Sequence, residues 1–200
     1  RMQRILSEPS AVFGDWTANI IEDATIDDLD PDAIRMAREK YTERHEIRAK
    51  EIESWDDATF LNKAKITRAG KITNAAIILL GREESEHFLS PAVCVIRWKL
   101  LAKEDKNKDF HNFHVPMIKS VEEITTGYIR NNNYVYTVSG NIFPENMMRY
   151  DVFTLREPIC NAIGHQDYGM GARIELLEYE DEKLVIQNYG QFIPNSVEDV

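Results

Sequence analysis

An amphipathic helix followed by two segments with the character of β-strands, all within the last sixty residues, most limits what this chain can fold into. The apolar residues of the helical segment stand at offsets of four, seven and eight, so they share one stripe of the helix. They are Leu155, Ile159, Ala162 and Ile163. Residues 173–179 alternate between apolar and polar positions, and after an acidic turn residues 184–188 are expected to pair back with them as a β-hairpin. Because both apolar surfaces must be buried, the sequence predicts an α+β fold in which the hairpin packs under a helix that Thr154 caps and that ends near His165.

The remaining segments predict further helices and strands. Asp30 and Pro31 form a cap and a first helical position, and the helix that they start is expected to end near Arg48. Thr73 and Gly81 bracket a short apolar helix. We also expect helices near 56–65 and 117–130 and strands near 93–101 and 134–138.

These elements divide the chain into two parts. Residues 1–90 form a helical linker region, and residues 91–200 form an α+β region with a mixed sheet that has helices on one face. Both ends look cut, since Arg1 precedes Met2 and the chain stops at Val200 without a closing element. The sequence therefore predicts a fragment of a longer protein.

The composition is that of a globular protein and excludes several classes. Apolar residues make up 43% and charged residues 29%, which argues against a disordered or collagen-like chain. There is no run of eighteen apolar residues and no apolar stretch behind the N-terminal residues, so neither a membrane span nor a signal peptide is expected. Cys94 and Cys160 have no metal or redox spacing, which predicts buried thiols in a reducing cytoplasm.

The net charge of −10 argues against a protein that coats nucleic acid. The charge is unevenly distributed, because residues 31–71 carry +2 and residues 141–200 carry −7. Any contact with DNA is therefore favoured in the first half, and we expect weak binding to duplex DNA at physiological salt.

Residues 63–71 are basic and turn at Gly70. A helix, a basic turn and a second helix are compatible with a DNA-reading winged helix, or with a packed helical pair that exposes its lysines. The packed pair is favoured, because the helix at 74–80 is almost wholly apolar and offers no polar face to a groove.

Glu157 and Asn161 stand four residues apart on the predicted helix, so their side chains share one face. An amide oxygen and a carboxylate side by side suit a hydrated Mg²⁺ site, in which the carboxylate accepts a proton from water. Ordinary surface polarity is the alternative, since this pair is common on helices.

The sequence around this pair resembles a known family. Residues 156–168 read Arg-Glu-Pro-Ile-Cys-Asn-Ala-Ile-Gly-His-Gln-Asp-Tyr. This is similar to the RE-x-x-x-N-x-x-x-H-[RQ]-D-Y segment of bacterial and archaeal proteins described as transcriptional regulators or RecG-related ATP-dependent DNA helicases. Residues 24–31, residues 71–81 and the Gly190-x-x-x-Pro194 stretch have counterparts in the same order. The resemblance therefore covers nearly the whole chain, and His-Gln-Asp-Tyr is its most specific part.

The resemblance implies a truncated ATPase fold of the GHKL (Bergerat) type in the second half, preceded by an AlbA-like, Schlafen-type DNA-binding domain that is absent from this chain. Glu157 would position water and Asn161 would hold Mg²⁺, while His165, Asn188 and Gly190 would contact the nucleotide ATP. Asn188 departs from the Asp-x-Gly box that contacts adenine, because a carboxamide keeps an acceptor but loses the charge.

Two further features depart from the implied picture. Pro158 lacks an N–H, so the helix is expected to start late or to kink near Glu157. The helicase label is in doubt, because the sequence contains no Gly-x-x-x-x-Gly-Lys-Ser/Thr phosphate loop.

Three hypotheses of function follow. The first is a regulatory module that links the absent DNA-binding domain to a GHKL-like nucleotide domain. The second is an ATPase in the full-length protein, with Glu157 as the catalytic residue and no turnover by the fragment alone. The third is a scaffold that forms homo-oligomers and no longer binds nucleotide. In each case the protein is expected in the cytoplasm without a membrane partner.

Overall fold

The structure is a computed structural model that describes residues 15–102, 106–129, 134–136, 145–147, 150–180 and 182–190. The fold is α+β, with a helical first part and a mixed sheet in the second, as predicted. It forms two compact units, residues 1–88 and 89–200, which are described separately. No helix in the described part of the chain has both the length and the apolar character needed to cross a membrane.

The first unit consists of short helices. They are α1 (Pro31–Arg44), α2 (Ala49–Glu53), α3 (Asp57–Lys63) and α4 (Asn74–Leu80), with 3-10 turns at Trp16–Ala18, Ile26–Asp28 and Glu46–Arg48. A further 3-10 segment, Glu83–Leu89, follows α4. The fully buried side chains of this unit include Leu29, Ile52, Phe60, Leu61, Ile77 and Leu80.

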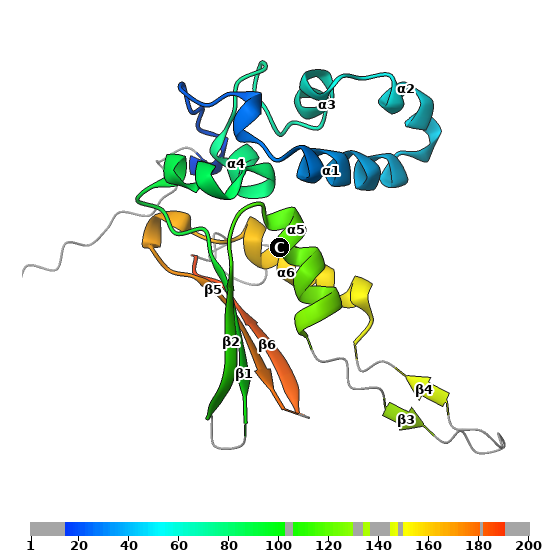
Figure 1. Ribbon diagram of the computed structural model, residues 1–200, viewed down its shortest axis with the longest axis vertical. Coiled ribbons are helices and arrows are strands. Elements are labelled where there is room, and N and C mark those ends of the chain that lie inside the picture. Colours follow the sequence, from blue (N-terminus) through cyan, green and yellow to red (C-terminus); the bar gives the residue numbers. More distant parts are fainter. Residues whose placement is uncertain are drawn as a thin grey trace, which may run out of the picture. The chain divides into compact units, whose positions relative to one another are not determined.

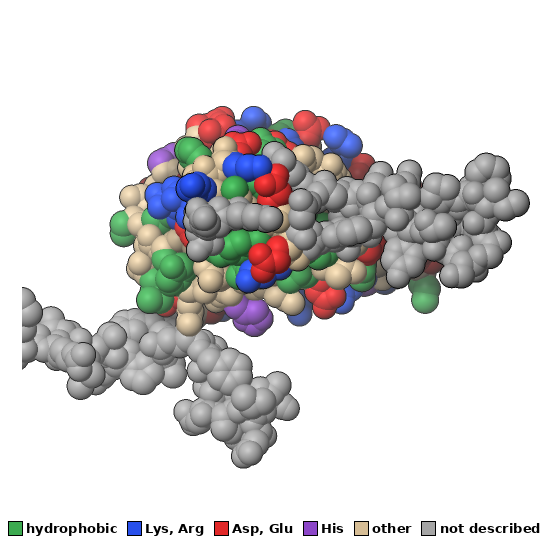
Figure 2. Space-filling view, turned by 90° about the horizontal axis from the view of Figure 1, so that it is seen from below, with side chains coloured by type: hydrophobic (Ala, Val, Ile, Leu, Met, Phe, Trp, Pro, Cys, Tyr) green, Lys and Arg blue, Asp and Glu red, His purple; other side chains and the backbone are tan. Residues whose placement is uncertain are grey.

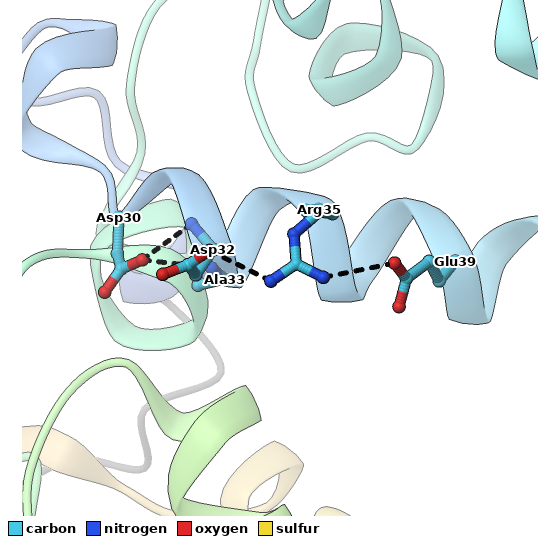
Figure 3. Close-up of polar contacts among 5 residues, drawn as sticks. All are labelled: Asp30, Asp32, Ala33, Arg35 and Glu39. Atoms are coloured by element: carbon cyan, nitrogen blue, oxygen red, sulfur yellow. Dashed lines mark hydrogen bonds and ion pairs between the residues drawn. The ribbon is translucent and has the colours of Figure 1, made fainter.

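The start of α1 confirms the predicted cap (Figure 3). The Asp30 carboxylate accepts hydrogen bonds from the main-chain N–H groups of Asp32 (2.8 Å) and Ala33 (3.1 Å). On the exposed side of the helix, Arg35 pairs with Asp32 at 2.9 Å and with Glu39 at 3.4 Å. These exposed pairs add little stability, so the cap and the buried face define the helix.

The end of α1 differs from the prediction, because the helix stops at Arg44 and not near Arg48. His45 leaves the helical conformation (φ −125°, ψ 47°), and its ring stacks on Tyr41 with centroids 4.2 Å apart. Arg38 then holds the returning chain, donating to the carbonyl oxygens of Ile52 (3.1 Å) and Trp55 (3.0 Å). These tertiary contacts override the continuous helical pattern in the sequence.

Local capping residues begin α3 and α4, and the cap of α4 at Thr73 was predicted. Asp56 accepts from Thr59 N–H at 2.7 Å, and Thr73 Oγ1 accepts from Ala76 N–H at 3.2 Å. After α3 the chain turns through a Schellman motif, in which Ile66 N–H donates to Leu61 O at 2.9 Å. This motif places Lys65 in the left-handed region, at φ 60°.

Replacing Lys65 with glycine is expected to stabilise the protein by about 1 kcal/mol. A left-handed conformation costs a residue with a Cβ roughly 1–2 kcal/mol, and glycine avoids most of this cost although its unfolded state is freer. Thermal unfolding of Lys65→Gly beside the parent protein measures the change. A lower melting temperature would contradict the strain that we assign to Lys65.

The second unit is built on a mixed four-stranded sheet. Its strands are β1 (Ile96–Leu101), β2 (Asn107–Phe113), β5 (Ile174–Tyr179) and β6 (Lys183–Gln187), in the order β2-β1-β5-β6. The pair β1–β5 is parallel, with Ile96 opposite Ile174, and the other two pairs are antiparallel. The sequence did not predict β2 as a strand, because its exposed residues show no apolar alternation.

Helices cover one face of this sheet (Figure 1). They are α5 (Met117–Glu123), which continues as a π-helical turn (Ile124–Tyr128), and α6 (Val152–Gly164). On the covered face, Ile96, Trp98 and Leu100 of β1 are buried beside Ile174 and Leu176 of β5. A separate antiparallel pair joins β3 (Tyr134–Tyr136) to β4 (Glu145–Met147).

Candidate functional site

Asp151, and not Thr154, caps the helix α6 that carries the candidate residues. The Asp151 carboxylate accepts from Thr154 N–H at 3.0 Å, so α6 begins at Val152. The helix therefore starts before the predicted cap and not late, and it contains Pro158. Leu155 and Ile159, on either side of Pro158, are both buried, and this packing maintains the helix across the missing N–H.

One stripe of α6 faces solvent and carries three of the predicted site residues. Glu157, Asn161 and His165 follow one another at intervals of four residues, and all three are exposed. The predicted apolar stripe on the other side of the helix is buried, as expected. The side chains of Glu157 and Asn161 form no hydrogen bond or ion pair with another described residue.

Arg156 fixes the rotation of α6 relative to α5. Its guanidinium forms a hydrogen-bonded ion pair with Glu122 of α5, and both side chains are about two-thirds buried. This pair, together with the apolar stripe, holds the neighbouring Glu157 on the outer side of the helix.

The turn after α6 is bonded to the loop after β6, and we call residues 165–167 and 188–190 the α6–β6 junction. Asn188 Nδ2 donates to His165 O at 3.0 Å. Asp167 N–H donates to Tyr189 O at 2.6 Å, and Tyr189 N–H donates to Gln166 Oε1 at 2.8 Å. The structure thus brings together three residues that the sequence associated only by resemblance, His165, Asn188 and Gly190.

Gly190 is required by close approach within the junction. A Cβ at this position would lie 2.6 Å from His165 O and 3.7 Å from Asp167 N, which are both main-chain atoms. Such a contact cannot be relieved by a side-chain rotation. The loop can therefore reach the turn after α6 only because residue 190 has no side chain.

Gln166 and Tyr168 are structural members of the site that sequence reasoning did not assign. Gln166 is 7% exposed, and its Nε2 donates to Ala172 O at 2.9 Å while its Oε1 accepts from Tyr189. Tyr168 is 4% exposed and donates to Ile163 O at 2.9 Å; burial raises the pKa of its hydroxyl, so it stays a donor. The only signal for them in the sequence was the His-Gln-Asp-Tyr block, and that block did not predict which residues they contact.

The junction also determines which atom of Asn188 stays available as an acceptor. Only the amide nitrogen of Asn188 can bond a carbonyl oxygen, so Oδ1 is left as an acceptor with no donor among the described residues. An aspartate here would place a carboxylate oxygen against His165 O, with no proton between them. Asparagine in place of the aspartate of the Asp-x-Gly box is therefore the residue that can bond His165 O.

The described residues contain no group of three or more His, Cys, Asp and Glu side chains that could hold a metal ion. The available oxygen ligands on α6 are the exposed Glu157 carboxylate and Asn161 carboxamide. This pair suits Mg²⁺, which takes few protein ligands and completes its shell with water and phosphate oxygens. Cys160, between them in sequence, is exposed, so the prediction of a buried thiol holds only for Cys94.

Comparisons with known proteins define the fold more than the chemistry. Residues 3–96 match a domain of unknown function, DUF8451. The crystal structure of the DIP2311 protein from Corynebacterium diphtheriae is similar, with a TM-score of 0.67 and 17% sequence identity over 92% of this chain. The match covers 35% of the DIP2311 chain, so the present chain spans about a third of that protein's length. No curated protein sequence matches the chain.

Proposed function

We propose that the second unit is a GHKL-like module that binds an adenine nucleotide with Mg²⁺. One observation carries the proposal: the α6–β6 junction ties the exposed Asn188 to the end of a helix that exposes Glu157 and Asn161, and it leaves Asn188 Oδ1 without a donor among the described residues. A helix, a hairpin and a glycine loop in this order are also what the family resemblance implies.

The residues present fit the nucleotide and the metal. Asn188 Oδ1 would accept from the adenine amino group, and Gly190 keeps the loop close to the turn after α6. Asn161 would ligate Mg²⁺ through its amide oxygen, one turn before His165, and Glu157 would orient a water molecule one turn earlier. Bound Mg²⁺ would neutralise phosphate charge.

Hydrolysis of ATP requires a base that activates water, whereas binding of ATP does not. The exposed Glu157 carboxylate makes no contact with another described residue that would prepare it as a base. We therefore propose that these 200 residues bind ATP without hydrolysing it at a useful rate. ATPase activity that Glu157→Ala abolishes would show instead that the catalytic site is complete within this chain.

We further propose that the module serves a DNA-binding transcriptional regulator related to RecG-like helicases. Its AlbA-like DNA-binding domain would lie outside residues 1–200, and the protein would act in the cytoplasm as a homo-oligomer.

A scaffold without nucleotide is the second candidate, and the junction itself favours it. The side chains of Gln166, Asp167 and Tyr168 all form hydrogen bonds within the protein. These residues of the His-Gln-Asp-Tyr block therefore have a structural role that requires no ligand. A scaffold leaves Asn188 Oδ1 without a donor among the described residues, however, whereas a bound nucleotide would supply one.

Isothermal titration calorimetry of ATP, with and without Mg²⁺, tests the proposal. We expect binding that depends on Mg²⁺ and that Asn161→Ala weakens by roughly tenfold, or about 1.4 kcal/mol. Asn62→Ala removes a matched exposed carboxamide from α3 and should leave the affinity unchanged. Absence of binding by the parent protein, or equal affinities for parent and Asn161→Ala, would favour the scaffold.

A further inference from the structure

The segment between Asp57 and Glu83 is strongly basic in an acidic protein. Residues 58–82 contain five Lys and Arg residues and no Asp or Glu, while the whole chain carries −10. The five cations are Lys63, Lys65, Arg68, Lys71 and Arg82. Four of these cations lie within nine residues before α4, and Arg82 follows α4. The helix α4 itself is mostly buried and carries no cation.

Three of the five cations contact other residues of the protein, and two form no ion pair with a described residue. Lys71 Nζ lies 2.6 Å from Glu22 Oε2, and Arg82 Nε donates to Asp27 O at 2.8 Å. Lys63 Nζ lies over the Trp55 ring, 5.0 Å from its centroid. Lys65 and Arg68 are exposed, and neither forms an ion pair with another described residue.

The backbone presents these two cations on a narrow turn. Arg68 and Lys71 exchange two main-chain hydrogen bonds of 3.0 Å each, and Ala69 (φ 52°) and Gly70 (φ 79°) form the tip. Both tip residues are in the left-handed region, as in a two-residue type I′ turn. In Figure 1 the connection between α3 and α4 extends away from both helices. The tip is exposed and small, so it can approach another backbone closely.

We infer that the turn 65–71 is a contact site for the phosphate backbone of duplex DNA, with Lys65 and Arg68 each bound to a phosphate. Charge complementarity supports this occupant, and the main-chain N–H groups of Ala69 and Gly70 have no acceptor among the described residues. A membrane surface suits the turn less, because none of its side chains is a large exposed apolar group. This inference is independent of the nucleotide site.

The expected contact is weak and independent of base sequence. Two phosphate contacts give a small electrostatic gain, and the remainder of the chain repels DNA. The face shown in Figure 2 mixes Lys and Arg with Asp and Glu, so that face offers no extended basic surface. The mostly buried helix α4 offers no polar face to read bases. The turn would therefore position DNA that a stronger domain holds.

Fluorescence anisotropy with a labelled duplex of about 20 base pairs, over about 20–150 mM salt, tests the inference. Arg68→Ala should lower the affinity about fivefold at 50 mM salt and reduce the slope of log K against log salt by about 0.9. Lys65→Gly should reduce the slope by a similar amount while raising the melting temperature, so its loss of affinity cannot come from unfolding. Arg44→Ala, which removes an exposed cation from the end of α1, is the charge-matched control and should change neither quantity by as much.

Three results would overturn the inference. The first is the absence of any DNA binding at the lowest salt. The second is an equal loss of affinity in Arg44→Ala and Arg68→Ala, which would indicate a general charge effect. The third is a stronger dependence on Lys65 and Arg68 for anionic lipid vesicles than for DNA, which would assign the turn to a membrane surface.

Discussion

Replacing Gly190 with alanine is expected to lower the free energy of unfolding of the second unit by about 3 kcal/mol. The new Cβ would lie 2.6 Å from His165 O, so the loop must move away from the turn after α6. That movement breaks the three hydrogen bonds of the α6–β6 junction, each of which contributes about 1 kcal/mol. Chemical denaturation monitored by tryptophan fluorescence measures the loss, because Trp98 is buried in this unit.

Gly164→Ala is the matched control for this prediction. Gly164 lies in the last turn of α6, and a Cβ there would meet nothing within 4 Å. Alanine should therefore stabilise the helix by roughly 0.5–1 kcal/mol. If Gly190→Ala unfolds at the same denaturant concentration as the parent protein, the close approach of the loop to His165 is wrong.

Gln166→Glu is expected to cost a similar amount, about 3 kcal/mol at neutral pH. The substitution keeps the size of the side chain but removes the donor to Ala172 O and places a buried charge beside that carbonyl. The bond from Tyr189 N–H can persist, so the cost arises at one end of the side chain.

The pH dependence distinguishes this mechanism from a general loss of packing. Burial raises the pKa of the new carboxyl above its unfolded value, so folding favours the protonated form. The deficit is therefore full above the folded pKa, and it shrinks as the pH falls and the protonated group regains a donor. Urea denaturation between about pH 7 and pH 5, compared with the parent at each pH, should show this narrowing. A deficit that stays constant would contradict the buried donor role of Gln166.

The sequence predicted the elements whose signals are local. Asp30 and Thr73 cap helices as expected, because the acceptor and the N–H groups that it binds lie within three residues. The apolar stripe of α6 and the alternation in β5 likewise identified their buried faces. The exposure of Glu157 and Asn161 follows from that same stripe.

The predictions failed where distant residues decide the outcome. The end of α1 depends on Arg38 contacting carbonyl groups fourteen and seventeen residues away. The helix α6 is capped by Asp151 and not by Thr154 as predicted. Both residue types can cap a helix, and the sequence alone does not rank them. Gln166 contacts Tyr189, which lies twenty-three residues away, so its role depends on the hairpin between them.

Asn188 stands where the family pattern has aspartate, and the structure gives a physical reason for the difference. From the sequence it was an acceptor without the charge of the usual aspartate. In the structure its amide nitrogen bonds His165 O, a contact that an ionised aspartate cannot make. The proposed nucleotide site therefore depends on an orientation that only the folded junction supplies.

Nuclear magnetic resonance titration with Mg²⁺ and ATP tests this site most directly. In ¹H–¹⁵N spectra we expect shifts of the side-chain amides of Asn161 and Asn188 and of the Gly190 main-chain amide. The Asn62 side-chain amide, in the first unit, should not respond. Shifts confined to residues outside α6 and the junction, or no shifts at millimolar ATP, would contradict nucleotide binding by this chain.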